Sequence, residues 1–139
     1  MKFKLMTETA TPPSKANVWD AGWDLYCDEH VAIMPGMRQM IKTGLALDIP
    51  QGHVGMIWPR SGLAARYGLD VLGGVVDSGY QGEVLVIMVN HGNFTYSAAP
   101  GTRIAQIVFQ PIMLGAMIET EEFSNPTTRG EKGFGSSGS

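Results

Sequence analysis

Charged residues and long apolar runs are both scarce in this chain of 139 residues. Only 17% of the residues are charged and the net charge is −3, so we expect no basic surface of the kind that neutralises the phosphates of nucleic acid. No apolar run approaches the roughly 20 residues of a membrane-spanning helix, and the first residues lack the apolar core of a signal peptide. Neither nucleic-acid binding nor membrane attachment is therefore expected.

Cysteine is also scarce, since Cys27 is the only one. A lone cysteine cannot form an intramolecular disulfide, which fits a reducing compartment. We therefore expect a cytoplasmic protein, or one of the host cytoplasm if its source is a virus. His30, His53 and His91 stand singly, without the pair spacings that place two ligands around one metal ion. A phosphate-binding G-x-x-x-x-G-K-[ST] loop and a G-x-S-x-G nucleophile elbow are missing too.

Glycine and proline are abundant instead, with 18 and 8 residues, and they interrupt short apolar runs at nearly regular spacing. This pattern predicts one mostly β domain. The predicted strands are 3–6, 40–49, 54–59, 84–90, 94–97, 103–112 and 116–123. Positions 84–89 are all apolar, so both faces of that strand should be buried, between two sheets or inside an oligomer. Only 61–68 is predicted to be helical, capped by Ser61 and ended by Gly68.

Polar residues inside otherwise apolar segments mark a candidate site. In "AGWDL", Asp24 lies within a predicted strand, either as an outward-facing acid or as a group that contacts a metal ion indirectly. In "PRSGLAARYG", Arg60 and Ser61 precede a short helix, where they form either a simple helix cap or an anion site. In "GTRIAQIVFQ", the amide of Gln106 beside Arg103 needs a partner, which is either phosphate or backbone.

Two further segments combine glycine with reactive or charged side chains. "GGVVDSGYQGE" presents Asp77 and Tyr80 from a glycine-bounded turn, although a turn aspartate often bonds only its own backbone. "RGEKGFGSSGS", at 129–139, has the composition of a disordered tail, yet Arg129 and the glycine amides suit a phosphate. Its G-x-G-x-x-G string is not a dinucleotide fingerprint, because no helix follows it.

In this order, the five segments resemble the five motifs of the trimeric dUTP pyrophosphatases, and they span residues 21–138. The resemblance implies a β-rich, jelly-roll-like fold in a homotrimer, with each active site built from more than one subunit. It also implies a β domain at 1–128 and a mobile glycine-rich arm at 129–139 that closes over the nucleotide. Some positions depart from common versions of the motifs: Gly79 replaces an acid, Gln81 replaces an arginine, Trp23 is bulkier than usual, and Val71 stands where some members have an asparagine.

The implied reaction is hydrolysis of dUTP to dUMP and pyrophosphate, which limits uracil incorporation into DNA and supplies dUMP for thymidylate synthesis. The resemblance makes Asp77 the base that activates water, and Mg²⁺ the cofactor, reached by Asp24 through water. Tyr80 would pack under the deoxyribose and Phe134 would stack on the base. The implied substrate-binding residues are Arg60, Ser61, Gly62, Val71, Val75, Val76, Tyr80, Leu85, Gln106, Arg129, Phe134, Gly135 and Ser136.

Two other interpretations remain open from the sequence. A dCTP deaminase shares the architecture but must activate water at the base, and the "DSGYQG" pattern matches the hydrolase better. A regulatory trimer would bind dUTP and signal to a partner protein through loops such as 120–128. The identity of such a partner cannot be read from the sequence.

Overall fold

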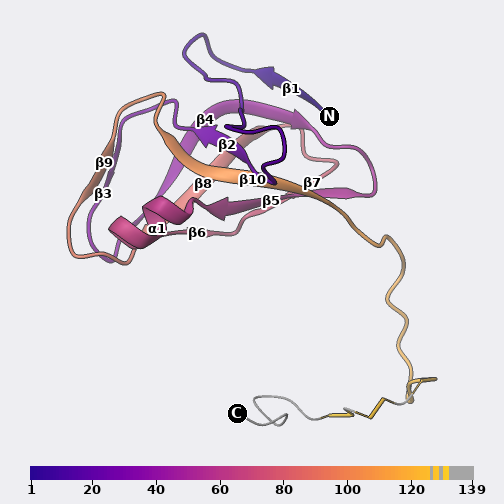
Figure 1. The fold of residues 1–139 in the computed structure, drawn as a ribbon. Coiled ribbons are helices and arrows are strands. Elements are labelled where there is room, and N and C mark those ends of the chain that lie inside the picture. The colour runs from indigo at the N-terminus through magenta and orange to yellow at the C-terminus, as the bar shows by residue number, and fades with distance from the viewer. Residues whose placement is uncertain (126, 129, 132–139) are drawn as a thin grey trace.

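Two antiparallel sheets of four strands each form the body of the molecule (Figure 1). The computed structural model describes residues 1–125, 127–128 and 130–131. The first sheet has the strand order β1 (Lys2–Leu5), β4 (Arg38–Asp48), β8 (Glu83–Asn90) and β6 (Leu69–Leu72). The second sheet has the order β2 (Trp23–Tyr26), β10 (Arg103–Pro111), β5 (His53–Pro59) and β7 (Val75–Asp77). A separate two-stranded ribbon pairs β3 (Val31–Ile33) with β9 (Tyr96–Ala98).

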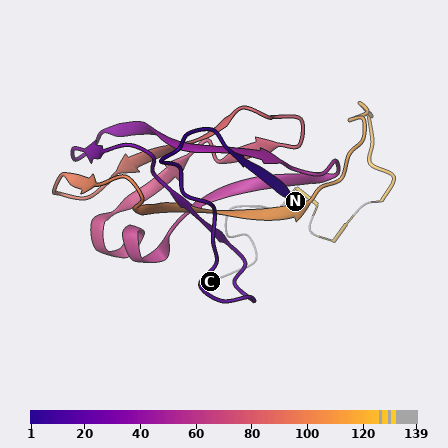
Figure 2. The same cartoon turned by 90° about the horizontal axis from the view of Figure 1, so that it is seen from above.

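The apolar core lies between the two sheets, which form the layers seen from above in Figure 2. Alternate residues of each strand point inward, so the core receives side chains from both layers. Fully or almost fully buried examples are Ile41, Val86 and Met88 from the first sheet and Leu25 and Ile107 from the second. The predicted mostly β, jelly-roll-like fold is confirmed. Within the described residues, no helix is long and apolar enough to cross a membrane.

Strand β8 is buried on one face and half-buried on the other. Val84, Val86 and Met88 lie in the core, whereas Leu85 and Ile87 are only partly covered. On that outer face, Ile87 lies directly opposite Met40 of β4, whose side chain is 60% exposed. The prediction that both faces of this strand are buried therefore holds within one chain for the inner face only.

The single helix α1 (Ser61–Tyr67) follows β5 directly. Its N-cap residue is Arg60 rather than the predicted Ser61, and no side chain bonds to the first turn. The predicted end is confirmed, because Gly68 adopts a left-handed conformation with φ of 67° and its N–H bonds to the Ala64 carbonyl. The helix therefore starts at the residue pair that the sequence marked as an anion site.

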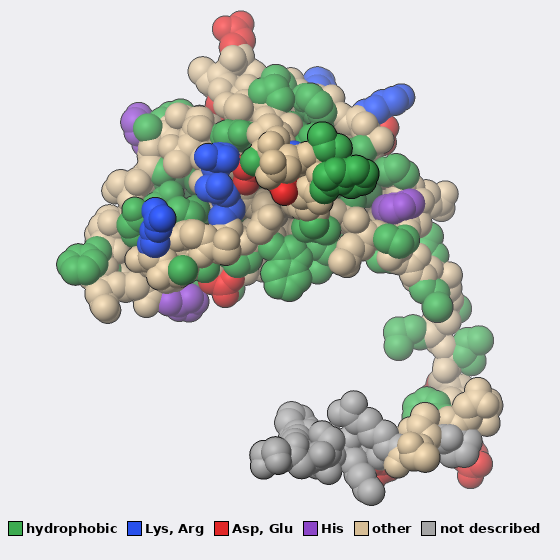
Figure 3. All heavy atoms as spheres, viewed as in Figure 1, with side chains coloured by type: hydrophobic (Ala, Val, Ile, Leu, Met, Phe, Trp, Pro, Cys, Tyr) green, Lys and Arg blue, Asp and Glu red, His purple; other side chains and the backbone are tan. Residues whose placement is uncertain are grey.

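The segment after β10 does not form the strand predicted at 116–123. Residues 112–125 have no regular secondary structure, and they lead away from the sheets in Figure 1. Met113, Met117 and Phe123 are almost fully exposed, and apolar side chains line this segment in Figure 3. A strand forms only against a partner edge, and within the described chain this segment pairs with none.

A bulge in β4 fixes the start of β8. The register of β4 against β8 shifts between Lys42 and Ala46, and Gly44 within the shift has a φ of 61°. Only glycine fits there, because a Cβ would come within 2.8 Å of the Asp28 carboxylate. Thr43, which is 1% exposed, donates its hydroxyl to the Val84 carbonyl at 2.6 Å. The bulge is therefore closely packed and hydrogen-bonded within the core.

Asn90 ties the far end of β8 to its neighbours. Its side chain is fully buried, and its Nδ2 donates to the carbonyls of Ile33 and Phe94, both at 2.8 Å. Its Oδ1 accepts the N–H of Gly92 at 2.9 Å. Gly92 packs against the last turn of α1, where a Cβ would lie 2.2 Å from the Tyr67 carbonyl oxygen. Asn90 thus holds the loop on which the end of the helix rests.

Candidate active site

A cleft of about 630 Å³ opens between the loop that precedes β2, the start of β10 and helix α1. Three guanidinium groups (Arg60, Arg66 and Arg103) and two carboxylates (Asp20 and Asp24) line it. The charged side chains of the cleft therefore sum to +1. A cleft with this balance favours an anionic ligand.

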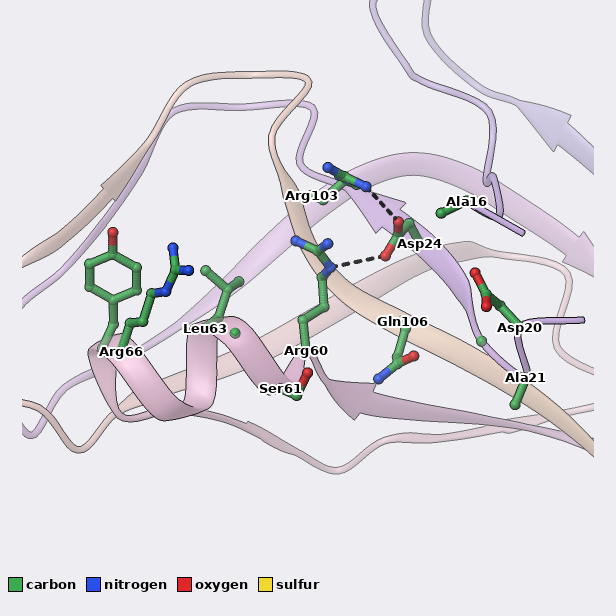
Figure 4. Close-up of a pocket in the computed structure, with 13 residues that line it drawn as sticks. Ala16, Asp20, Ala21, Asp24, Arg60, Ser61, Leu63, Arg66, Arg103 and Gln106 are labelled. Atoms are coloured by element: carbon green, nitrogen blue, oxygen red, sulfur yellow. Dashed lines mark hydrogen bonds and ion pairs between the residues drawn. The ribbon is translucent and has the colours of Figure 1, made fainter. Parts of the chain in front are cut away.

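Asp24 lies between two of the arginines (Figure 4). Its Oδ1 is 2.9 Å from Arg60 Nε and its Oδ2 is 3.2 Å from Arg103 Nη1. The Asp24 side chain is only 15% exposed, so the sequence-based alternative of an outward-facing, solvated acid is wrong. The carboxylate is held in the middle of β2, whereas the arginines come from the cap of α1 and the first position of β10. It fixes the direction of two cations that would otherwise be free to rotate.

Gln106 of β10 lies directly opposite Asp24 in the sheet. Its Nε2 donates to the Pro59 carbonyl at 3.0 Å, so the structure supplies a backbone partner for this amide. The other side of the amide lies against Gly22, where a Cβ would be only 2.2 Å from Gln106 Oε1. The glycine of "AGWDL" is therefore required for the close approach of this side chain.

Ser61 and Gly62 also line the cleft, as the first two residues of α1. Among the described residues, the Ser61 hydroxyl takes part in no hydrogen bond, and space is open beside the Gly62 Cα. The predicted residues Asp24, Arg60, Ser61, Gly62 and Gln106 are thus brought together. Sequence reasoning did not include Asp20 and Arg66, because a single loop acid and a single helical arginine carry no distinguishing pattern.

Asp77 and Tyr80 lie in a second, smaller pocket of about 300 Å³. The Tyr80 N–H donates to the Asp77 carbonyl at 3.0 Å and closes the turn between them. Val75, Val76 and Leu85 line this pocket as well. Gly79 has open space around its Cα, so the missing acid at this position leaves no gap in the packing.

Val71 differs from the other predicted base-pocket residues. It lies on β6 opposite Met88, and its side chain packs against the core rather than into the pocket. Arg129, Phe134, Gly135 and Ser136 lie outside the described residues, so their predicted contacts stay predictions.

The two pockets are far apart within one chain. Asp77 pairs with Val54 near the start of β5, whereas Arg60 follows the last residue of the same strand. Val54 and Arg60 are six residues apart in the chain, which corresponds to roughly 20 Å along an extended strand. The predicted site residues therefore fall into two separate groups, one with the cations and Gln106 and the other with Asp77 and Tyr80, which we call half-sites.

The carboxylate oxygens of the cleft can hold a hard cation such as Mg²⁺ only together with oxygen atoms of a bound substrate. No three His, Cys, Asp or Glu side chains converge within the part of the chain that the structure describes. Asp20 and Asp24 offer carboxylate oxygens, the type of donor that Mg²⁺ prefers, and each Asp24 oxygen keeps a second acceptor position beside its arginine. Two carboxylates are too few to complete the octahedral shell, so phosphate oxygens and water must supply the rest.

Cys27 lies outside both pockets. It is 1% exposed, and its Sγ donates to the Ala99 carbonyl at 3.1 Å. Burial raises the pKa of the Cys27 thiol above its usual range, and burial raises the pKa of the Tyr96 phenol in the same way. Both groups therefore stay protonated near neutral pH.

The two packed sheets and the arginine-lined cleft define a jelly-roll-like β protein with a cleft suited to an anionic ligand. Comparison with known proteins gives the family: the profile of the dUTPase family matches residues 8–138, and the chain belongs to that family. A deoxyuridine 5'-triphosphate nucleotidohydrolase of Nautilia profundicola is 43% identical over 99% of this chain and 98% of its own length. The Variola virus protein of the same name is 39% identical over 99% and 92% of the two chains.

Solved structures agree with this assignment. The dUTPase of Staphylococcus bacteriophage 80alpha, determined with dUpNHpp, superposes with a TM-score of 0.93 at 31% identity and covers 99% of this chain and 98% of its own. A mutant dUTPase of phage phi11 of S. aureus, described with a structural Mg(II) ion, has a TM-score of 0.83 at 27% identity over 89% and 98% of the chains.

Proposed function

We propose that this protein hydrolyses dUTP to dUMP and pyrophosphate. The observation that carries the proposal is the cleft in which Asp24 orients Arg60 and Arg103 next to Gln106 and Ser61. The family assignment and the names of the relatives support the same substrate. A cytoplasmic location fits the single, buried cysteine.

The cation half-site binds the triphosphate. Arg60 and Arg103 present fixed positive charge, and the Ser61 hydroxyl and Gln106 amide add neutral donors. Negative charge grows on the leaving pyrophosphate as the bond breaks, so donors that are already oriented lower the barrier without reorganising. The ion pairs of Asp24 provide this orientation before the substrate arrives.

Asp77 acts as the general base. Its carboxylate orients a water molecule and takes a proton from it while the water oxygen attacks the α-phosphorus in line. The bond from the α-phosphorus to the oxygen that bridges to the β-phosphorus breaks, and the electron pair leaves with pyrophosphate. The products are dUMP, which gains the water oxygen, and pyrophosphate.

The second pocket selects the nucleoside. Main-chain groups at Val71, Val75, Val76 and Leu85 pair with the uracil edge, where cytosine would place a donor against a donor. Tyr80, whose side chain is 46% exposed in this pocket, packs under the deoxyribose and excludes a 2′-hydroxyl.

Mg²⁺ binds together with the triphosphate in this proposal. Phosphate oxygens would hold the ion, and Asp24, with Asp20 in the same cleft, would contact it through water. When bound, the ion would neutralise negative charge on the phosphates. A structural Mg(II) ion in the related phage phi11 protein supports a role for this metal in the family.

A homotrimer is the assembly that joins the two half-sites. Three features of the single chain support it: the distance of roughly 20 Å between the half-sites, the exposed apolar side chains of residues 112–123, and the exposed outer face around Met40. Residues 129–139 would close over the nucleotide, with Arg129 on the phosphates and Phe134 on the base. Light scattering tests the assembly, since a stable and active monomer would exclude shared sites.

One assay separates the possible activities. The protein is incubated with Mg²⁺ and dUTP, dCTP, dTTP or UTP in turn, and the products are identified by chromatography. Formation of dUMP and pyrophosphate from dUTP alone supports the proposal. Deamination of dCTP, or tight binding of dUTP without turnover, would replace it by a deaminase or by a regulatory binding protein.

A further inference from the structure

Tyr80 is held at its tip and along one face. Its phenol donates to the main-chain carbonyl of Glu83 at 2.8 Å. The ring lies against Gly82, where a Cβ would be 2.7 Å from the phenol oxygen and 2.8 Å from Cζ. The ring therefore rests on bare backbone, and its exposed face is the one that the pocket leaves open to a ligand.

Glu83, the first residue of β8, is fixed by its own side chain. Its Oε1 accepts the N–H of Gly44 at 2.8 Å. Gly44 belongs to the closely packed bulge of β4, where Thr43 is buried and bonded to Val84. Glu83 thus accepts the Tyr80 phenol with its main-chain carbonyl, and its side chain is bonded to the neighbouring strand β4.

We infer that Glu83 is a positioning residue for sugar selection, which acts through Tyr80. This inference rests on the proposed function, in which Tyr80 packs under the deoxyribose. A ring that excludes a 2′-hydroxyl must stay within a fraction of an ångström of its position, and such precision requires a second set of contacts behind the first. The contacts from Gly44 to Glu83 and from Glu83 to Tyr80 are that second set.

Sugar selection therefore depends on the Glu83 carboxylate, which lines the same pocket as Tyr80 but is bonded to Gly44 of β4. Removing the Glu83 side chain frees the start of β8 and lets the Tyr80 ring shift. A shifted ring loses packing against the deoxyribose and opens space for the 2′-hydroxyl of UTP. The ratio of kcat/KM for UTP to that for dUTP measures this effect directly, because it does not depend on the amount of active protein.

The test compares Glu83→Ala and Glu83→Gln with a matched control. Glu83→Gln keeps an acceptor oxygen for Gly44, so it should restore the wild-type ratio. Glu29→Ala is the control, because Glu29 Oε1 accepts the Lys42 N–H on the same strand at 2.9 Å but does not line the pocket of Tyr80. If carboxylate bonding to β4 were only structural, both alanine variants would behave alike.

We expect Glu83→Ala to raise the UTP/dUTP ratio by at least about twofold, the low end of the coupling between residues in one hydrogen-bonded network. Glu29→Ala should leave the ratio unchanged at a comparable melting temperature. An unchanged ratio in folded Glu83→Ala, or an equal rise in Glu29→Ala, would overturn the inference. If the wild-type protein fails to hydrolyse dUTP, the proposed function itself fails, which is a different result.

Tyr80→Phe gives a second test that does not depend on the folding of Glu83→Ala. It removes only the phenol oxygen that bonds to Glu83, so the ratio should rise here as well. The double variant Tyr80→Phe/Glu83→Ala should show no larger ratio than the greater of the two single variants, because both changes break the same chain of contacts. The inference would be contradicted by a wild-type UTP/dUTP ratio in Tyr80→Phe. It would also be contradicted if the ratio of the double variant rose by the product of the two single effects.

Discussion

Replacing Asp24 by asparagine tests whether this carboxylate orients the cations of the cleft. The change keeps the size of the side chain but removes the negative charge, and its amide nitrogen faces a guanidinium group. A hydrogen bond to a charged group contributes about 1.5–3 kcal/mol, and the Arg60 pair belongs at the low end because its side chains are partly exposed. The Arg103 side chain is 47% exposed, so solvent screening reduces its pair to about 0.5 kcal/mol.

Because asparagine retains one acceptor oxygen, we expect Asp24→Asn to lose about 1–2 kcal/mol of unfolding free energy rather than the full sum. Urea unfolding at one fixed protein concentration measures this loss. We also expect kcat/KM for dUTP to fall about tenfold, because the two arginines are no longer oriented. This fall corresponds to a rise of about 1.4 kcal/mol in the activation free energy.

Asp20→Asn is the matched control for stability. Asp20 lines the same cleft, but its Oδ2 accepts the main-chain N–H of Asn17 at 2.8 Å and its side chain forms no ion pair within the described structure. The same chemical change at Asp20 should lower the free energy of unfolding by at most about 0.5 kcal/mol, as is usual at a surface position. Equal losses in the two variants, or an Asp24→Asn protein as stable and active as the wild type, would refute the reasoning.

Four further predictions follow from other parts of the molecule. Asp77→Asn should still bind a non-hydrolysable dUTP analogue but lose about 10²- to 10⁴-fold in kcat, and near-normal turnover would remove Asp77 as the base. Asn90→Leu leaves two carbonyls and one N–H without their partner, so urea unfolding should show a loss of about 3–5 kcal/mol, and a loss below 1 kcal/mol would mean that water replaces the amide. Deletion of residues 129–139 should leave a folded protein that binds dUTP but hydrolyses it slowly; full activity would make this segment a linker. Cys27 has a raised pKa when folded, so its contribution is complete below the usual value of 9.0 and is lost as the pH rises further. Relative to Cys27→Ala, the wild type should therefore lose stability above that pH, and parallel pH curves would contradict this.

Local patterns predicted most of the sheet strands, because alternation and turn residues act over a few positions. The predicted strands at 54–59, 84–90 and 103–112 match β5, β8 and β10 to within one residue. The segment 116–123 has the same composition but is not a strand in the single chain, since pairing depends on an edge that composition cannot reveal. Strands as short as β3 and β7 have too few residues for a readable alternation.

The candidate site was predictable in its residues but not in its contacts. Motif order singled out Asp24, Arg60 and Gln106, yet the ion pairs depend on the register of β2 against β10 and on the cap of α1, which local sequence does not specify. Glu83 and Asn90 were missed because each is a single polar residue at one end of an apolar strand, where a solvated position is the ordinary reading. Their bonds to residues 39 and 57 positions away appear only in the folded chain.

In the proposed homotrimer, the uncovered apolar segment after β10 would divide folding into two stages. The β-sheets can close in a unimolecular step, because their core is complete within one chain. The side chains of Met113, Met117 and Phe123 remain in water until they meet another surface, and that second step is governed by protein concentration. In that trimer, a newly made chain would first be folded yet prone to aggregation, so its yield in the cell would depend on how quickly it meets two other copies as well as on the stability of its core.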